Sequence, residues 1–315
     1  MKNIIIWAES SAEIEDFIKL TEGEARFNIK KVFIAKRGVG NNYLTGVYFP
    51  YDLKLKACLV DELKAPKFII DLVQWCSPDI IIANERKALL SIETTYHTLT
   101  YNNIAQRIPR QTCSSVKSVP NVIFQKIQDR KLDTTKIWFC KSFISADFIY
   151  NTPSLAILFT EDDFDTKRKQ LVDLCNIMIG GIDPKDIVSK IKDDMNFFAS
   201  KYDARSVLYT KRGDLRNWIR NDKNKVIVII GVKPEGTGWK TKGTGLMDPY
   251  PGLVKMSELL FCFDGNGKRI KKLWTYFKFL PRNFWWFEKY PNEIYYSIIK
   301  EFSDKVYYKG ELKND

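Results

Sequence analysis

The most regular hydrophobic pattern in the chain consists of two short apolar runs, 79–83 and 88–92, separated by the polar stretch 84–87. Apolar runs of this length, bounded by turn residues, are typical of buried β-strands. The pattern therefore predicts two strands joined by a tight turn. An amphipathic stretch at 67–76 predicts a helix before them. A basic stretch at 101–109 predicts a helix after them, and 119–125 predicts a further strand.

The remaining pattern predicts a mixed α/β (α+β) protein. Residues 1–64 are expected to form a strand, a helix and then several strands. Strands are expected at 137–139 and 155–159, and helices at 165–179, 185–200 and 211–220. The run 225–232 is the strongest strand signal and should be a central strand. Because there is no internal repeat and no low-complexity linker, we expect one domain over 1–315.

Two carboxylates mark the ends of the predicted hairpin. Asp79 opens its first strand and Glu93 closes its second. Opposite ends of a hairpin are adjacent in space, so both carboxylates should meet at one edge of the sheet. Paired carboxylates are hard oxygen ligands suited to Mg²⁺. The alternative is structural, because strands end at the surface and acidic residues often flank them.

This stretch resembles the PD-(D/E)xK nuclease superfamily and, within it, the type II restriction endonucleases. The matching residues are Pro78-Asp79, Glu93-Thr94-Thr95 and Gln106-Arg107, over about a tenth of the chain. The resemblance implies a restriction-endonuclease-like core, a central mixed sheet flanked by helices, within about 60–130. It also implies a C-terminal elaboration with DNA-recognition or accessory elements at about 200–315.

The resemblance further implies that Asp79 and Glu93 ligate Mg²⁺, joined by the backbone carbonyl of Thr94. The family places a lysine two residues after the glutamate, where this chain has Thr95. A threonine hydroxyl can orient a water molecule but cannot deprotonate it.

Three other side chains are candidates to act beside Thr95. Lys87 across the turn and Gln106 from the following helix are candidates to replace the lysine. His97 shares a strand face with Glu93 and Thr95, where it would act on the water or contact phosphate; a buried or helix-capping role is the alternative.

The charge balance points to a polyanionic partner. The chain has 50 Lys and Arg against 38 Asp and Glu, a net charge of +12. Such an excess attracts nucleic acid, although a lysine-rich proteome without a partner is the alternative. A long loop at 233–252 is rich in glycine, threonine and lysine, which suits close approach to phosphates. The predicted DNA-contacting residues are Lys87, Asn102, Asn103, Arg107, Arg110, Lys211, Arg212, Lys240 and Lys242.

Composition excludes several other classes. No apolar stretch is long enough to span a membrane. Six scattered cysteines without a C-x-x-C pair, and one histidine, exclude zinc sites recognisable by spacing. No phosphate-binding glycine loop indicates a nucleotide cofactor. We therefore expect a cytoplasmic protein, without a membrane partner, whose chemistry is carboxylate–metal chemistry or binding alone.

The sequence thus favours a Mg²⁺-dependent type II restriction endonuclease that cleaves double-stranded DNA at a specific site as a homodimer. One alternative is a repair or structure-specific nuclease of the same fold. The other is a non-catalytic basic DNA-binding protein in which the two carboxylates are structural.

Overall fold

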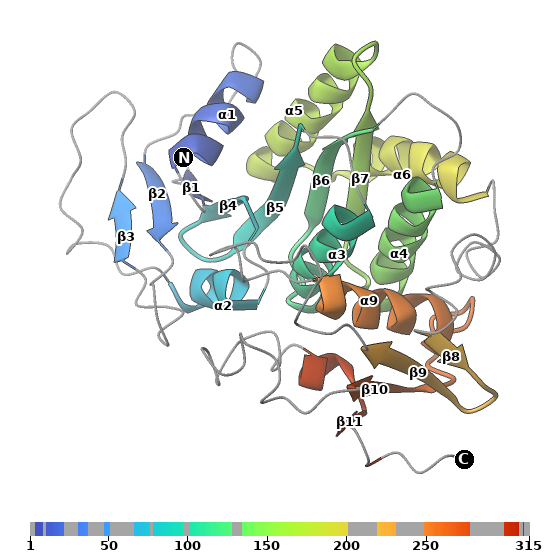
Figure 1. Cartoon of the computed structure of the whole chain (residues 1–315). Coiled ribbons are helices and arrows are strands. Elements are labelled where there is room, and N and C mark those ends of the chain that lie inside the picture. Colours follow the sequence, from blue (N-terminus) through green and yellow to red (C-terminus); the bar gives the residue numbers. More distant parts are fainter. Residues whose placement is uncertain are drawn as a thin grey trace.

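Seven strands of the described residues form the main sheet of the protein, seen in the computed structural model (Figure 1). The structure describes residues 4–8, 11–21, 31–36, 47–50, 66–75, 78–96, 101–127, 134–200, 219–230, 249–277, 299–308 and 311. The strands of the main sheet are β1 (Ile4–Ala8), β2 (Lys31–Lys36), β3 (Val47–Pro50), β4 (Ile80–Asn84), β5 (Ala88–Thr95), β6 (Asn121–Lys126) and β7 (Ser154–Phe159). Their order is β3-β2-β1-β4-β5-β6-β7.

The main sheet is mixed, as expected for an α/β protein. The pairs β1–β2, β5–β6 and β6–β7 are parallel. The pairs β2–β3, β1–β4 and β4–β5 are antiparallel. β4 and β5 therefore form a hairpin at the middle of the sheet. On one side of it β1 and β2 are parallel to each other, and on the other side β6 and β7 are parallel to β5.

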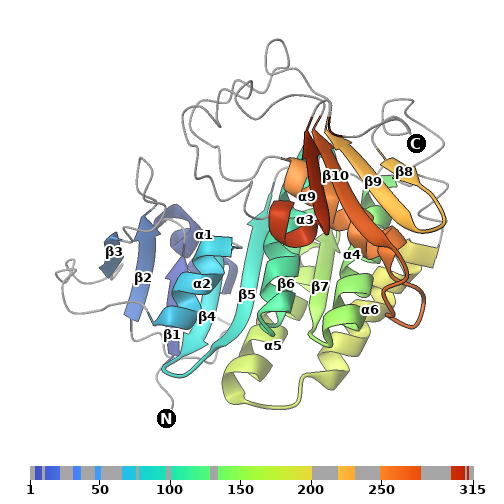
Figure 2. The ribbon, with the colours of Figure 1, turned by 90° about the horizontal axis from the view of Figure 1, so that it is seen from below.

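Helices cover both faces of the main sheet. α1 (Ser11–Thr21) and α5 (Phe164–Gly180) lie on one face, while α3 (Tyr101–Val116) and α4 (Thr134–Tyr150) lie on the other (Figures 1 and 2). α2 (Lys67–Trp75) packs against α3, and α6 (Lys185–Ser200) packs against α4 and β7. None of the helices in the described ranges is long and apolar enough to cross a membrane.

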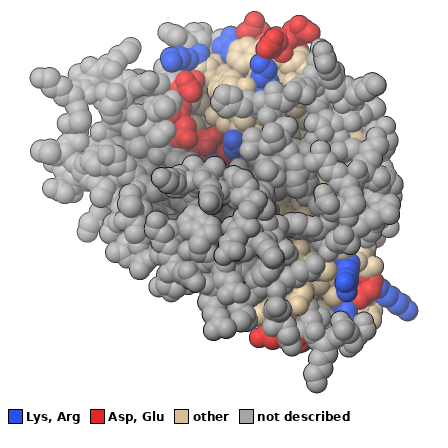
Figure 3. All heavy atoms as spheres, in the orientation of Figure 1, with Lys and Arg blue, Asp and Glu red and all other residues tan. Residues whose placement is uncertain are grey.

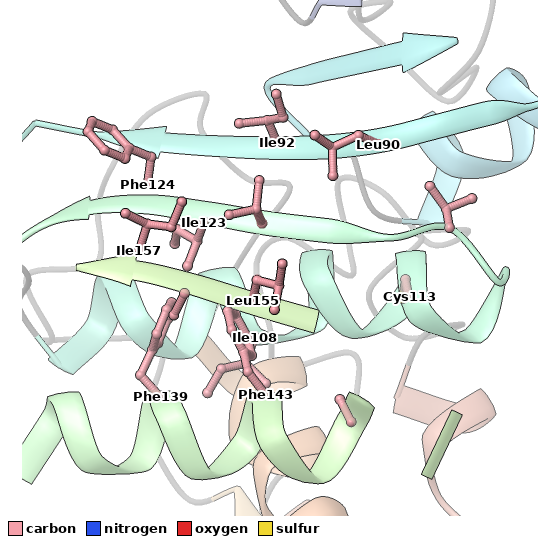
Figure 4. Close-up of a cluster of buried hydrophobic side chains, with 14 of the residues drawn as sticks. Leu90, Ile92, Ile108, Cys113, Ile123, Phe124, Phe139, Phe143, Leu155 and Ile157 are labelled. Atoms are coloured by element: carbon pink, nitrogen blue, oxygen red, sulfur yellow. The ribbon is translucent and has the colours of Figure 1, made fainter. Parts of the chain in front are cut away.

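The hydrophobic core on the α3–α4 side fixes α3 above β5 and β6. Figure 4 shows Ile108 of α3 and Phe139 and Phe143 of α4 beneath the strands, in one buried cluster with Ile123 of β6. These four side chains are fully buried. A helix anchored in this way presents its remaining faces at fixed positions, which matters for the arginines described below.

The predicted strand at 137–139 is wrong, because these residues belong to α4. α4 packs against α3, β7, α6 and the π-helical turn described below, so it is apolar on several sides. Such a helix lacks the amphipathic periodicity that distinguishes helix from strand in a sequence. Two strands, at 119–125 and 155–159, are confirmed as β6 and β7, and the helices at 165–179 and 185–200 are confirmed as α5 and α6.

A second sheet lies beyond the helices. It contains β8 (Ile219–Asn221), β9 (Lys225–Ile230), β10 (Lys272–Phe277) and β11 (Lys305–Tyr308) in the order β11-β10-β9-β8. α9 (Pro249–Ser257) runs into a π-helical turn, η2 (Glu258–Cys262), and packs against α3 on one side and β9 on the other. In Figure 2, seen from below, this sheet lies in front of α9.

The second sheet changes two expectations. The predicted helix at 211–220 is wrong at its end, since Ile219 and Arg220 belong to β8; its first part, 211–218, lies outside the described residues. The carboxylate of Asp222 accepts the backbone N–H groups of Asn224 and Lys225 and so closes the β8–β9 turn. The strand signal at 225–232 is confirmed over β9, which is an interior strand of this second sheet and not of the main one.

A buried charged group fastens α9 to α4. The ammonium group of Lys255 donates to the Tyr150 hydroxyl at 2.7 Å and to the Glu258 carboxylate at 2.6 Å. It also lies 4.4 Å from the ring centroid of Phe302. The other carboxylate oxygen of Glu258 lies 3.7 Å from the guanidinium of Arg269. We call Tyr150, Lys255 and Glu258 the lysine cluster.

Candidate active site

The hairpin of β4 and β5 brings Asp79 and Glu93 together. Ile80 pairs with Ile92 in the antiparallel register, and Asp79 immediately precedes Ile80 while Glu93 immediately follows Ile92. At the other end, the Asn84 side chain closes the turn by accepting the backbone N–H groups of residues 86 and 87. The expected order of helix, two strands, helix and strand is confirmed as α2, β4, β5, α3 and β6.

Thr94 holds the carboxylate of Asp79 in place. Its backbone N–H donates to Oδ2 of Asp79 at 2.8 Å, and its hydroxyl lies 3.4 Å from the same oxygen. The backbone carbonyl of Thr94, expected to be a metal ligand, accepts the Thr95 hydroxyl at 2.7 Å. Thr94 therefore positions one carboxylate through its N–H, while one lone pair of its carbonyl is already engaged.

Two arginines of α3 complete the site. Arg107 and Arg110 are three residues apart and so share one face of the helix. The Arg107 guanidinium is paired with Glu93. Nη1 of Arg110 donates to Oε1 of Glu93 at 2.8 Å and lies 3.3 Å from Oδ1 of Asp79. One nitrogen thus contacts both carboxylates. We call Asp79, Glu93, Arg107 and Arg110 the carboxylate–arginine cluster.

The carboxylates form the inner layer of this cluster and the arginines the outer one. The Glu93 side chain is 0% exposed and the Asp79 side chain 9%, against 19% for Arg107 and 13% for Arg110. A ligand that enters from solvent would therefore meet the guanidinium groups first and the carboxylates behind them.

The environment of Asp79 disfavours its charge. Burial, and next the negative charge of Glu93, raise the pKa of the Asp79 carboxyl from its ordinary 3.8 to about 8. Arg110, Arg107 and the Thr94 N–H act in the opposite direction and offset only part of this rise. A pKa displaced so far, beside a second carboxylate, is characteristic of functional sites.

Glu93 has an unused ligand atom. Its Oε2 is buried and has no hydrogen-bond partner among the described residues. A buried carboxylate oxygen without a partner costs free energy unless a ligand uses it. No group of three or more His, Cys, Asp or Glu side chains able to hold a metal ion occurs in the described ranges. Two adjacent carboxylates with one oxygen unsatisfied nevertheless fit a hard divalent cation that keeps several water ligands, as Mg²⁺ does.

Lys87 is not part of this cluster. It lies in the exposed turn before β5, six positions before Glu93, which corresponds to about 20 Å along a strand. The structure therefore contradicts the expectation that Lys87 replaces the family's lysine. It lies instead beside a cavity of about 680 Å³ at the opposite end of the sheet, also lined by Ser118, Asn151 and Gly181.

The other expected residues fall into two groups. Asn102, Asn103 and Gln106 belong to α3, and the structure describes their backbone within that helix. The residues His97, Lys211, Arg212, Lys240 and Lys242 lie outside the described residues.

The sequence did not reveal that Arg110 bridges both carboxylates. A spacing of three residues puts Arg107 and Arg110 on one helix face, but the direction of that face depends on how Ile108 packs into the core. Gln111, next to Arg110, was also missed. It is fully buried, and neither its amide nitrogen nor its amide oxygen has a hydrogen-bond partner among the described residues.

Comparison with known proteins assigns no family. No family model, no curated protein and no solved structure matches this chain.

Proposed function

We propose that this protein is a Mg²⁺-dependent nuclease, most similar in its site to a type II restriction endonuclease that cleaves double-stranded DNA. The observation that carries the proposal is that one guanidinium nitrogen of Arg110 contacts two buried carboxylates, Asp79 and Glu93, while Oε2 of Glu93 has no hydrogen-bond partner among the described residues. The net charge of +12 supports a polyanionic substrate.

In this proposal Asp79 and Glu93 hold the cation. Bound Mg²⁺ supplies a water molecule of lowered pKa and neutralises charge on the scissile phosphate. The Thr94 N–H keeps Asp79 oriented, and the antiparallel register keeps Glu93 beside it. The raised pKa of Asp79 means that its proton must leave when the cation binds.

In this proposal the two arginines provide the positive charge that the lysine provides in the nuclease superfamily. A guanidinium remains protonated at any working pH, so Arg107 and Arg110 cannot act as bases. They can bind a phosphate through two parallel hydrogen bonds, a geometry that a lysine does not offer. Their position on the solvent side of the carboxylates supports a role in holding the substrate phosphate.

Cleavage of plasmid and phage DNA by the purified protein, with Mg²⁺ or with EDTA, tests the proposal. We expect discrete Mg²⁺-dependent fragments from the wild type. Asp79→Asn should lose at least about 10³-fold in rate, because several kcal/mol of transition-state stabilisation depend on the cation. Lys190→Gln, on the exposed surface of α6, is the matched control and should cut normally. Cleavage by Asp79→Asn at the wild-type rate would exclude this site.

A smear in place of discrete fragments would favour the repair or structure-specific nuclease of the same fold. One observation favours the non-catalytic alternative: both arginines already neutralise Glu93, as they would in a purely structural ion-pair cluster. In that case DNA would be retarded on a gel by both the wild type and Asp79→Asn, and neither would cleave it.

A further inference from the structure

The second sheet has one face packed on α9 and one turned away from it. On β9, Val226 and Val228 are fully buried, whereas Lys225 and Ile227 are partly exposed. On β10, Leu273, Thr275 and Phe277 are buried, whereas Lys272, Trp274 and Tyr276 are exposed or partly exposed. Alternation along a strand places these two sets on opposite faces. We call the partly exposed side the outer face.

The outer face carries cations on every strand. They are Arg220 on β8, Lys225 on β9, Lys272 on β10 and Lys305 on β11. None of these four strands contains an aspartate or a glutamate. In register, Lys272 lies opposite Lys225, and Lys305 lies opposite Trp274. Four strands span about 14 Å, roughly the axial length of four nucleotides of one strand.

Among the described residues, two acids beside this sheet, Asp222 and Asp304, have other partners. Asp222 is committed to the backbone of the β8–β9 turn, with a longer contact of 4.0 Å to Lys225. Asp304 accepts the backbone N–H of Leu273 and pairs with Arg269. Figure 3 shows Lys and Arg side chains gathered at the lower right, in the region of the β8–β9 hairpin of Figure 1, with acidic side chains among them.

Aromatic rings lie among these cations. The ammonium groups of Lys225 and Lys305 lie 4.4 Å and 5.4 Å from the ring centroid of Trp274. The Tyr307 ring lies 5.4 Å from the Trp274 ring, and Tyr276 is opposite Tyr307 in the register. The rings thus hold the lysines close to the sheet, which reduces the rotamer entropy that phosphate binding would cost.

We propose that the outer face of the second sheet binds a single-stranded segment of nucleic acid. Lys225, Lys272 and Lys305 contact its phosphates, and Trp274, with Tyr307 beside it, stacks on unpaired bases. The aromatic rings decide between single strand and duplex, because bases expose their faces for stacking only when they are unpaired. This surface is separate from the carboxylate–arginine cluster, and the proposal stands whether or not the protein cleaves DNA.

The test is fluorescence anisotropy with a labelled oligothymidylate of about 12 nucleotides, titrated in EDTA over a range of salt concentrations. Trp274→Ala should weaken binding about 10-fold without changing the salt dependence, because a ring carries no charge. Trp274→Phe should restore most of the affinity. The double variant Lys272→Gln/Lys305→Gln should lower the slope of log K against log salt by about 1.4, since each phosphate contact on a single strand contributes about 0.7.

Matched controls come from α6, away from this sheet. Phe197 is 58% exposed and Lys190 is exposed, so Phe197→Ala and Lys190→Gln should bind the oligomer like the wild type. Thermal unfolding of each variant confirms that it is folded. The proposal fails if folded Trp274→Ala binds like the wild type, or if unlabelled duplex of matched length competes as well as single strand.

The same assay separates this proposal from the proposed function. Asp79→Asn should bind the oligomer with unchanged affinity. Binding without any Mg²⁺-dependent cleavage would support the outer-face proposal and contradict the proposed nuclease function. Cleavage without oligomer binding would support the nuclease function and contradict the outer-face proposal.

Discussion

Two groups of buried charges in the described part of the chain differ in how completely their members are satisfied. In the lysine cluster, Lys255 donates to both Tyr150 and Glu258, and Arg269 meets the second carboxylate oxygen of Glu258. In the carboxylate–arginine cluster, Glu93 keeps a buried oxygen without a partner in the described chain, and the pKa of Asp79 is raised to about 8.

We interpret this difference as one between a structural group of charges and the proposed metal site. Burial alone would lower the pKa of Lys255, but the charge of Glu258 and the Tyr150 oxygen outweigh it, so the net shift of this pKa is upward and Lys255 remains charged. That group is complete without a ligand. The carboxylate–arginine cluster is not, because Oε2 of Glu93 has no partner among the described residues and the pKa of Asp79 stays raised despite the two arginines. Variants of the two groups should therefore behave in opposite ways.

The largest effect on stability is expected at Lys255. Lys255→Met leaves Glu258 buried without its main partner, which should lower the free energy of unfolding by about 3–5 kcal/mol. Urea denaturation measures this loss in the free energy of unfolding. The double variant Lys255→Met/Glu258→Gln removes both charges and should recover more than half of the loss. A small effect of the single variant would mean that Arg269 alone can balance Glu258.

Mg²⁺ should stabilise the folded protein only by binding to the carboxylate–arginine cluster. At a concentration 100 times its dissociation constant, the ion should add about 2.7 kcal/mol to the free energy of unfolding. Differential scanning fluorimetry should show this as a higher Tm for the wild type, but not for Asp79→Asn. The Lys255→Met variant should keep the Mg²⁺ response despite its lower starting Tm. An equal response in Asp79→Asn would place the ion elsewhere.

The affinity for Mg²⁺ should depend on pH through Asp79. Below pH about 8 the ion must displace a proton from this carboxyl, so its affinity should fall about tenfold, or 1.4 kcal/mol, for each pH unit. Isothermal titration calorimetry from pH 6 to pH 9 should show the affinity level off above about 8. Affinity independent of pH would mean that Asp79 is already ionised or is not a ligand.

The stability of the metal-free protein should have the opposite pH dependence. The folded state holds the proton of Asp79 more tightly than the unfolded state, whose pKa is near 3.8. The stabilising contribution is therefore complete below that value and is lost as pH rises towards about 8. In EDTA, the stability of Asp79→Asn should not fall over this pH range. The difference in stability between the wild type and this variant therefore measures the contribution of the Asp79 carboxyl alone.

The smallest effect is expected at Gln111. Its buried amide has no partner in the described chain, so Gln111→Met should raise the free energy of unfolding by about 1 kcal/mol. Chemical denaturation measures the gain, and the DNA cleavage assay shows whether the amide serves the site. Stability unchanged together with lost cleavage would assign Gln111 to the site; a fall in stability would show that the amide has a partner.

The sequence was sufficient to predict the carboxylate pair because its geometry is local. A hairpin with a short turn leaves little freedom in which residues lie opposite each other, so Asp79 and Glu93 could be brought together from the pattern alone. The two arginines could be placed on one helix face for the same reason. Their contact with both carboxylates required the packing of α3 against the sheet.

Non-local features were not predictable. The apolar run at 137–139 has the composition of a strand. It belongs to a helix that packs against four neighbouring elements, and these contacts, which make the helix apolar on several sides, are not visible in the sequence. The strength of the strand signal at 225–232 indicated burial but did not indicate that β9 belongs to a second sheet. Lys87 was assigned to the site because it is only six positions from Glu93 in the sequence. Most of β5 lies between the two residues, and an extended strand places them at opposite ends.

The carboxylate–arginine cluster also has a consequence for the order of folding. The ion pairs described above for this cluster join residues between positions 79 and 110, whereas the described strands of the second sheet come from residues 219–308. Short chain segments close at small entropic cost, and the N-terminal part of a chain leaves the ribosome first. We therefore expect the hairpin and α3 to meet while the second sheet is still being synthesised. The later chain then docks through α9 on a site that is already assembled.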